Sequence, residues 1–435
     1  MTHSKIARLL TVAILTNVLL ASAWALDDSP AQAATRCSRT ARNAAHPRGV
    51  AARITGWLHT CRDGTIRNAK GRKIRLNGLE YFRLGGGNAG TGKCDHAWTP
   101  LPPMAPSAIA GWGFNSVELF FSWQNLEPTP PTFNPVTKKL EHHYDPVYLA
   151  DLDSAIRQLT SNGLGVVLVL MQSRWSGAFQ DITTSDGAYY PCGVGLPAWI
   201  YERNGQAAGN GADMVKAEVS FFQNTQRVED VTYKHSETMQ TSFIKMWRFL
   251  AKHYVRKRRV VGAFPMFEAY DILTRSYQGA ENVRPGTIRL ASFFERVTRA
   301  IHGANPHLVN FFAEQKSRTT GKWAMTRRPR VPNGASATEF YNGRWPGTGK
   351  RRLSAHYLRA KRWRYPFYVD EFDAFGMGRN KPTAFWQQDT IDMLKWEKGH
   401  QVSWSFNSYQ PGGLMVMPTW TDPKTDLLRA LRRGF

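Results

Sequence analysis

The sequence has few residues that could crosslink it or hold a metal. Only four of its 435 residues are cysteines, at positions 37, 61, 94 and 192. No two of them lie within the two to four residues that separate paired ligands in a zinc site. We therefore expect no metal site and no cofactor. Beyond the N-terminus, no stretch is long and apolar enough to cross a bilayer.

The N-terminal residues 1–25 are the one strongly apolar segment. Lys5 and Arg8 precede an apolar run over residues 9–20, and Ala23-Trp24-Ala25 follows as a small-x-small cleavage motif. A retained membrane anchor is the alternative, but the run is shorter than the roughly 20 residues that a span needs. The pattern predicts a cleaved signal peptide and a protein that is secreted, either extracellular or associated with the cell wall.

The four cysteines are an even number in a chain expected to be exported, which favours two disulfides. Three connectivities are possible. We favour Cys37–Cys61, which would fix an N-terminal arm, and Cys94–Cys192, which would join two loops.

Acidic residues are scarce: 33 Asp and Glu stand against 57 Lys and Arg, for a net charge of +24. Loss of Lys5 and Arg8 with the signal peptide leaves 24 − 2 = +22. Such a surface favours an anionic cell-wall or extracellular polymer as a partner. The basic residues are scattered and match no nucleic-acid-binding fold, so we expect no nucleic acid partner. The protein is expected to be a monomer.

The chain shows no internal repeat and no interdomain linker. Residues 26–55, rich in Ala, Arg, Ser and Pro, are predicted to form a flexible basic arm. Residues 56–435 are predicted to form one domain. It begins with a small hairpin marked by turns at Asp63-Gly64 and Lys70-Gly71.

Within that domain, short apolar runs alternate with segments of helical periodicity, as expected for a parallel α/β fold. Eight strands are predicted, at 74–82, 113–121, 165–171, 260–267, 307–313, 335–341, 366–372 and 401–406. This count predicts a single (β/α)8 TIM barrel with long loops after the strands, over 85–110 and 172–237 in particular.

Two of these strands end in a glutamate. Residues 260–267 are apolar and are followed by Glu268, and the strand at 366–372 carries Glu371 near its end. Barrel enzymes place their chemistry at the carboxyl ends of the strands. Strands four and seven face each other across the barrel mouth, so the two carboxylates are expected to converge. Two such groups about 5–5.5 Å apart are what a retaining glycosidase uses.

The order of these signals resembles glycoside hydrolase family 5, a cellulase-like family of retaining barrel enzymes. The resemblance covers nearly all of residues 56–435 and implies that Glu268 is the acid/base and Glu371 the nucleophile. It rests on these segments: DGTIRNAKGRKIRLNGL at 63–79, GFNSVE at 113–118, WQNLEP at 123–128, LDSAIRQLTSNGLGVVLVL at 152–170, VVGAFPMFE at 260–268, PFYVDEF at 366–372, and Trp404.

The chain departs from the family at several supporting positions. Phe267 and Ala269 flank Glu268 where the family has Asn-Glu-Pro, and Glu118 replaces the arginine that orients the nucleophile. For Glu118 we expect an ion pair with a basic residue. The strand-three histidine falls near Met171 or Gln172, so Gln172 is a substrate-binding candidate. Of the strand-six His-x-Tyr, only Tyr341 matches.

Aromatic residues are candidates for stacking on sugar rings, with packing in the core as the alternative. These candidates are Trp123, Trp175, Trp345 and Trp404. His142-His143 beside Asp145 suggests a metal site, but adjacent side chains of an extended segment point in opposite directions, so a solvated loop is favoured.

The sequence thus predicts a secreted retaining β-glycosidase acting on a polysaccharide, oligosaccharide or glycoconjugate. The alternative is a barrel that binds a carbohydrate or wall polymer without cleaving it.

Overall fold

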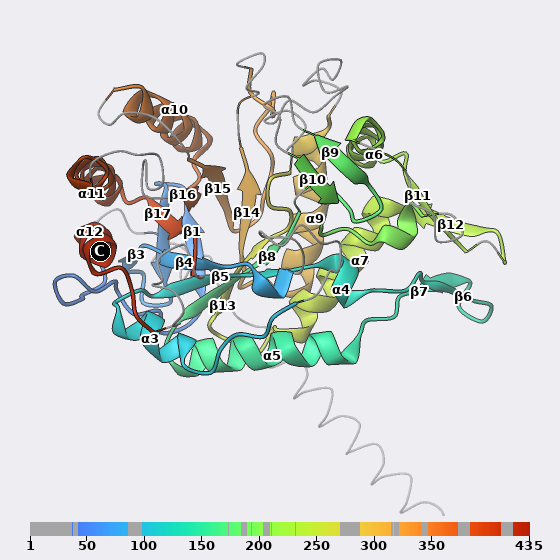
Figure 1. Cartoon of the computed structure of the whole chain (residues 1–435), viewed down its shortest axis with the longest axis horizontal. Coiled ribbons are helices and arrows are strands. Elements are labelled where there is room, and N and C mark those ends of the chain that lie inside the picture. The colour runs from blue at the N-terminus through green and yellow to red at the C-terminus, as the bar shows by residue number, and fades with distance from the viewer. Residues whose placement is uncertain are drawn as a thin grey trace, which may run out of the picture.

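The protein forms a closed barrel of eight parallel strands surrounded by helices (Figure 1). The computed structural model describes residues 37, 42–85, 98–172, 174–183, 189–192, 194–202, 209, 211–230, 232–269, 288–314, 316, 322–340, 347–372, 383–409 and 421–435. The signal peptide predicted for residues 1–25 lies outside these ranges.

The barrel strands follow one another in chain order, and the last pairs with the first. They are β4 (Asn77–Tyr81), β5 (Ser116–Phe121), β8 (Gly165–Leu170), β13 (Val260–Phe264), β14 (Val309–Ala313), β15 (Gly334–Glu339), β16 (Phe367–Phe372) and β17 (Ser403–Phe406). The predicted TIM barrel is confirmed, and each predicted strand overlaps an observed one. The sixth predicted strand, which has the weakest sequence pattern, corresponds to β15.

The helices flank the barrel on the outside. They are α3 (Ala105–Gly111), α4 (Trp123–Leu126), α5 (Pro146–Ser161), α6 (Gly211–Gln223), α7 (Met239–His253), α9 (Leu290–Ala304), α10 (Thr348–Trp363), α11 (Thr383–Gly399) and α12 (Thr425–Leu431), with short 3-10 turns at Arg83–Gly85, Ala198–Ile200 and Arg432–Gly434. Helix α9 begins at Leu290, and no side-chain hydrogen bond from its N-cap residue Arg289 caps it.

A three-stranded sheet precedes the barrel, made of β1 (Leu58–Cys61), β2 (Thr65–Asn68) and β3 (Lys73–Ile74). Its turns lie at the two predicted sites, where Gly64 and Gly71 have φ angles of +81° and +73°. Only glycine adopts this conformation without steric cost. The backbone N–H of Thr60 donates to Asn333 at 2.7 Å, which ties the sheet to the chain just before β15.

The segment just before this sheet is not a free arm. Ala44, Ala51, Ala52 and Ile54 are buried, and the backbone N–H of Ala44 donates to the carbonyl of Lys73 at 2.8 Å. The prediction of a flexible arm up to residue 55 is therefore wrong for residues 44–54. Its alanines, which gave no periodic signal, pack against the barrel because small side chains allow close backbone contact.

The long insertion between β8 and α7 holds two further hairpins besides α6. Their strands are β9 (Gln180–Thr183) with β10 (Tyr189–Cys192), and β11 (Arg227–Asp230) with β12 (His235–Thr238). A third hairpin, β6 (Thr132–Asn134) with β7 (Lys139–Glu141), follows α4. The sequence predicts a long loop over residues 172–237, where β9–β10 and most of β11–β12 form instead.

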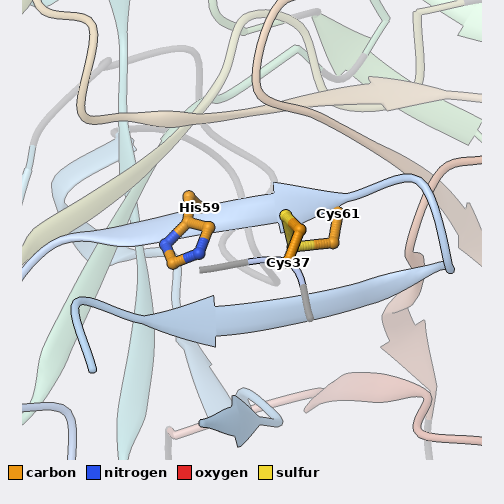
Figure 2. A group of neighbouring side chains, drawn as sticks. All are labelled: Cys37, His59 and Cys61. Atoms are coloured by element: carbon orange, nitrogen blue, oxygen red, sulfur yellow. A yellow bond between two sulfur atoms is a disulfide. The ribbon is translucent and has the colours of Figure 1, made fainter. Parts of the chain in front are cut away.

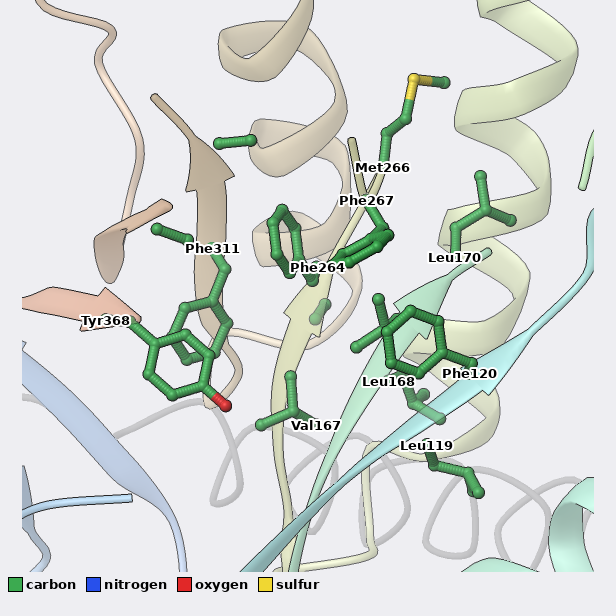
Figure 3. Packing of buried hydrophobic residues seen from close by; sticks show 14 of the residues in the cluster. Leu119, Phe120, Val167, Leu168, Leu170, Phe264, Met266, Phe267, Phe311 and Tyr368 are labelled. Carbon is green, nitrogen blue, oxygen red and sulfur yellow. The ribbon is translucent and has the colours of Figure 1, made fainter. Parts of the chain in front are cut away.

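The core joins buried side chains of the barrel strands to those of the surrounding helices, and Figure 3 shows part of it around Phe264 and Phe311. The ring centroids of Phe311 and Tyr368 lie 4.8 Å apart, and those of Phe120 and Phe267 lie 5.0 Å apart edge to face. Burying such side chains contributes about 1.5–3 kcal/mol each. This packing joins β14 to β16 and β5 to the segment after β13.

One disulfide joins Cys37 to Cys61 in β1, as predicted (Figure 2). His59 lies beside it, and the donor atoms of Cys37, His59 and Cys61 lie within 4.8 Å of one another. Metals bind thiolates, and both sulfurs are already used in the S–S bond. The predicted Cys94–Cys192 bond falls outside the described residues and side chains, and it stays a prediction.

Loss of the Cys37–Cys61 bond is expected to destabilise the fold. The cysteines are 24 residues apart in sequence, and closing a loop of this length contributes roughly 3 kcal/mol. We expect Cys37→Ser/Cys61→Ser to unfold at a lower urea concentration than the wild type. An unchanged midpoint would contradict this expectation.

Among the described residues, no helix has the length and apolarity that a membrane span requires.

Candidate active site

Glu268 and Glu371 both lie at the carboxyl ends of barrel strands. Glu371 is the fifth residue of β16, and Glu268 follows the end of β13 by four residues. Both glutamates are largely buried, with 7% of each residue exposed. In the barrel, β13 is strand four and β16 is strand seven, and this face of a (β/α)8 barrel is where active sites form.

The backbone at Glu268 adopts an unusual conformation. Its φ angle is +47°, in the left-handed region that side chains other than glycine rarely occupy. Just before it, Phe267 is 3% exposed and packs against Phe120 and Phe264. The left-handed backbone and the buried Phe267 beside it constrain the main chain from which the Glu268 side chain projects. Residues held in such conformations concentrate at functional sites.

Glu371 receives a hydrogen bond from a side chain that the sequence did not single out. The Nδ2 amide of Asn407, the residue after β17, donates to Glu371 Oε1. The backbone carbonyl of Glu371 also accepts from the N–H of Phe340 at 2.8 Å. The only sequence signal for Asn407 was a polar residue at the end of the apolar strand SWSF.

Three further carboxyl groups lie inside the barrel, and we call Glu80, Glu118 and Asp370 the acid group. They are at most 2% exposed and come from β4, β5 and β16. Glu80 and Glu118 are directly opposite each other in the paired strands β4 and β5. The sequence did not predict this group, because β4, β5 and β16 are brought together only when the barrel closes.

Burial is the main influence on the acid group. It raises the pKa of Glu80 well above its usual value, and the nearby charges of Glu371, Glu118, Asp370 and Glu339 raise that pKa further. Burial also raises the pKa of Glu118, against the opposing effect of the Tyr368 and Ser405 hydroxyls. The protonated, neutral form of these carboxyls is therefore favoured.

Asp370 is the member of the acid group that interacts with Glu268. Burial raises the pKa of Asp370 well above its usual value, and the charges of Glu118 and Glu268 raise it further. Since Glu371 acts on Glu80 and Glu118 while Glu268 acts on Asp370, both strand-end glutamates lie near one buried set of carboxyls.

Among the residues that the structure describes, Glu118 does not form the expected ion pair with a basic residue. Its neighbours are the hydroxyls of Tyr368 and Ser405 and the carboxylate of Glu371. An ion pair inside the barrel would have to offset the free-energy cost of removing both ions from water. A protonated carboxyl carries no charge and needs no counter-ion.

Three tryptophans predicted to stack on sugar belong instead to the core, where each is 0% exposed. Trp123 donates its Nε1–H to Glu127 at 2.7 Å, and Trp175 donates to the hydroxyl of Tyr201 at 2.6 Å. Trp404 stacks on Phe435, with centroids 5.7 Å apart, near the start of β17 rather than its end. Large apolar rings give the same sequence signal in a core as in a cleft.

Of the remaining predicted binding residues, the structure describes only Gln172. Gln172 is 0% exposed, two residues beyond the end of β8. Tyr341 and Trp345 lie outside the described residues, and their roles stay predictions.

His142 is not in a solvated loop, as had been favoured, but bridges two glutamates. Its Nδ1 lies 2.6 Å from Glu127 Oε1 and its Nε2 lies 3.0 Å from Glu237 Oε1. Burial lowers the pKa of His142, but the two glutamates outweigh it and the net pKa is raised. With hydrogen bonds from His142, Lys245 and Ser242, the pKa of partly buried Glu237 is lowered to about 2. This network joins β7 and β12 to α7 and is structural.

Comparisons with known proteins give matches in structure only. No protein-family model matches the sequence, and no curated protein matches it in sequence. An endogalactoceramidase structure has a TM-score of 0.62 at 17% identity, covering 87% of this chain and 84% of that chain. An iminocyclitol complex of endo-glycoceramidase II from Rhodococcus sp. has a TM-score of 0.59 at 19% identity, covering 86% and 80%.

A third structure is more distant. The cellulose synthase subunit Z of Clostridioides difficile has a TM-score of 0.50 at 13% identity, covering 82% of this chain and 99% of that chain. At identities this low, the likeness shows a shared fold.

Proposed function

We propose that this protein is a retaining O-glycosyl hydrolase in which Glu268 is the acid/base and Glu371 the nucleophile. The observation that carries the proposal is the pair of largely buried glutamates at the carboxyl ends of strands four and seven. Both lie near the same buried carboxyls. Double displacement at a sugar needs two carboxyl groups that face one site, and this placement supports the proposal.

The reaction has two steps. The protonated Glu268 carboxyl donates its proton to the glycosidic oxygen while a Glu371 carboxylate oxygen attacks the anomeric carbon, which releases the alcohol and forms a glycosyl ester. Glu268, now a carboxylate, then removes a proton from water. The water oxygen attacks the anomeric carbon, breaks the ester and restores both groups.

Asn407 and the acid group support Glu371 in this scheme. The amide of Asn407 donates to one oxygen of Glu371 and so helps to hold the carboxylate in place. Keeping Glu80 and Glu118 neutral avoids like-charge repulsion beside the nucleophile, so the site needs no arginine to offset it.

The proposed substrate is a β-linked glycan or glycoconjugate. Structures of similar fold include enzymes named for ceramide glycosides, one of them solved with ganglioside GM3. We further propose that residues 1–25 are a secretion signal, in keeping with the Cys37–Cys61 disulfide. N-terminal sequencing of the exported protein would check this.

Covalent trapping tests the proposal. A 2-fluoroglycoside with a good leaving group forms the glycosyl ester but hydrolyses slowly, so the protein should gain the mass of one fluorosugar on the peptide that contains Glu371. We would use a panel of 2-fluoro glucosides, galactosides, cellobiosides and lactosides. The matched Glu371→Gln variant should gain no mass.

A non-catalytic carbohydrate-binding barrel is the second candidate. It is favoured by Phe267, which replaces an amide with a core aromatic, and by Glu118, which replaces an arginine with a carboxyl. Sugar binding without an adduct on any member of the panel would support this candidate against the hydrolase.

A further inference from the structure

Helices α7 and α9 pack against each other on the outside of the barrel (Figure 1), and residues of both line a basic groove. The groove has a volume of about 480 Å³. Its lining residues are Lys245, Arg248, Phe249, Lys252, Gly303 and Ala304. None of them is acidic.

The groove is remote from the candidate active site. Gly303 and Ala304 are the last residues of α9, which leads into the start of β14 at Val309. The groove therefore reaches the amino-terminal end of the barrel, whereas Glu268 and Glu371 lie at the carboxyl ends of the strands. A ligand held there would not occupy the proposed active site.

The cations of the groove form a row along α7. Lys245, Arg248 and Lys252 lie three and four residues apart, so they share one helix face and span about 10 Å along the axis. Just beyond the helix, the exposed Arg256, Lys257 and Arg258 extend the basic sequence. A row of cations suits a chain that carries repeated anionic groups better than it suits a single ion.

Little negative charge offsets this row. Lys245 is bonded to Glu237, the partly buried glutamate of the His142 network. Arg248 and Lys252 are exposed, and among the described residues no ion pair is recorded for either of them. These two therefore supply most of the attraction for an anionic partner.

The row of cations along α7 matches the repeated anionic groups of a single extended chain. Phe249 adds an aromatic wall that is partly exposed and stacked on Tyr144, with centroids 4.1 Å apart. Aromatic surfaces suit the apolar faces of sugar rings.

We infer that this groove binds a linear polyanionic polysaccharide. The partner would place its sulfate or carboxylate groups against Arg248 and Lys252 and a sugar ring against Phe249. The interaction would hold the barrel on an anionic glycan while the opposite end of the barrel stays open. It is separate from the proposed hydrolase activity.

Binding to heparin and to polygalacturonate tests the inference. With the signal-free protein in about 50 mM salt, we expect Arg248→Glu/Lys252→Glu to weaken binding of at least one of them about tenfold or more, because both reversed charges face the chain. Raising the salt should weaken wild-type binding and narrow the difference. Binding should persist in Glu371→Gln, which separates this result from the fate of the hydrolase proposal.

The matched control is Lys350→Glu/Arg351→Glu, which reverses two exposed charges on α10. It should weaken binding less than about threefold. Equal losses in both double variants would show that only net charge matters and would overturn the inference. Failure of the wild type to bind either glycan would also overturn it. Tighter binding to phosphatidylserine vesicles or single-stranded DNA than to either glycan, if Arg248→Glu/Lys252→Glu weakens it, would overturn the inference as well.

Discussion

Replacing Glu371 with glutamine should reduce glycoside hydrolysis at least about a thousandfold, because an amide cannot form the glycosyl ester on which both steps depend. The substitution keeps the size of the side chain and its place beside Asn407. Thermal unfolding should therefore change little. The measurement is kcat/KM on the aryl glycoside that the wild type hydrolyses best.

Glu268→Gln is the matched comparison, because the two glutamates are equally exposed at 7%. Loss of the proton donor should reduce hydrolysis of alkyl glycosides by about 10²–10⁴-fold. Dinitrophenyl glycosides should be far less affected in the first step, since their leaving group needs no proton. If leaving-group acidity makes no difference to Glu268→Gln, Glu268 is not the acid.

Replacing Glu80 with glutamine should change how stability depends on pH. Burial and nearby carboxylates hold the folded-state pKa of Glu80 well above the unfolded value. Its stabilisation is thus fully present below the unfolded pKa and is lost as pH rises toward the folded one. In that window the wild type should lose about 1.4 kcal/mol of unfolding free energy per pH unit through this group.

Glu80→Gln should remove most of that slope, so it should gain stability relative to the wild type between pH 5 and pH 7. Urea unfolding at several pH values measures the slope. Asp426→Asn, the same chemical change at an exposed residue of α12, should leave the slope as it is. A Glu80→Gln slope equal to that of the wild type would mean that Glu80 does not take up a proton on folding.

Much of the fold was predictable because the barrel strands are apolar runs that end abruptly in polar residues. Val260–Phe264 and Phe367–Phe372 were located together with their glutamates. The structure differs most from the prediction in segments that are buried by residues distant in the sequence. Ala51 and Ala52 carry no periodic signal, yet they pack under the barrel.

The candidate site was predictable only at its two glutamates. Asn407 reaches Glu371 because β16 and β17 are neighbours, a relation that residue type alone does not reveal. The acid group was missed for a different reason: a glutamate within a strand usually indicates a solvated or paired side chain. Here desolvation keeps the group neutral, and burial of this kind cannot be read from one strand at a time.

The place of Phe267 in the core restricts how this site can change. Exchanging it for asparagine would remove an aromatic ring packed 5.0 Å from Phe120 and would cost roughly 3–5 kcal/mol. An amide at this position would need larger neighbouring side chains to fill the space that the ring leaves. Redesign of the site should therefore begin with the core beneath Glu268.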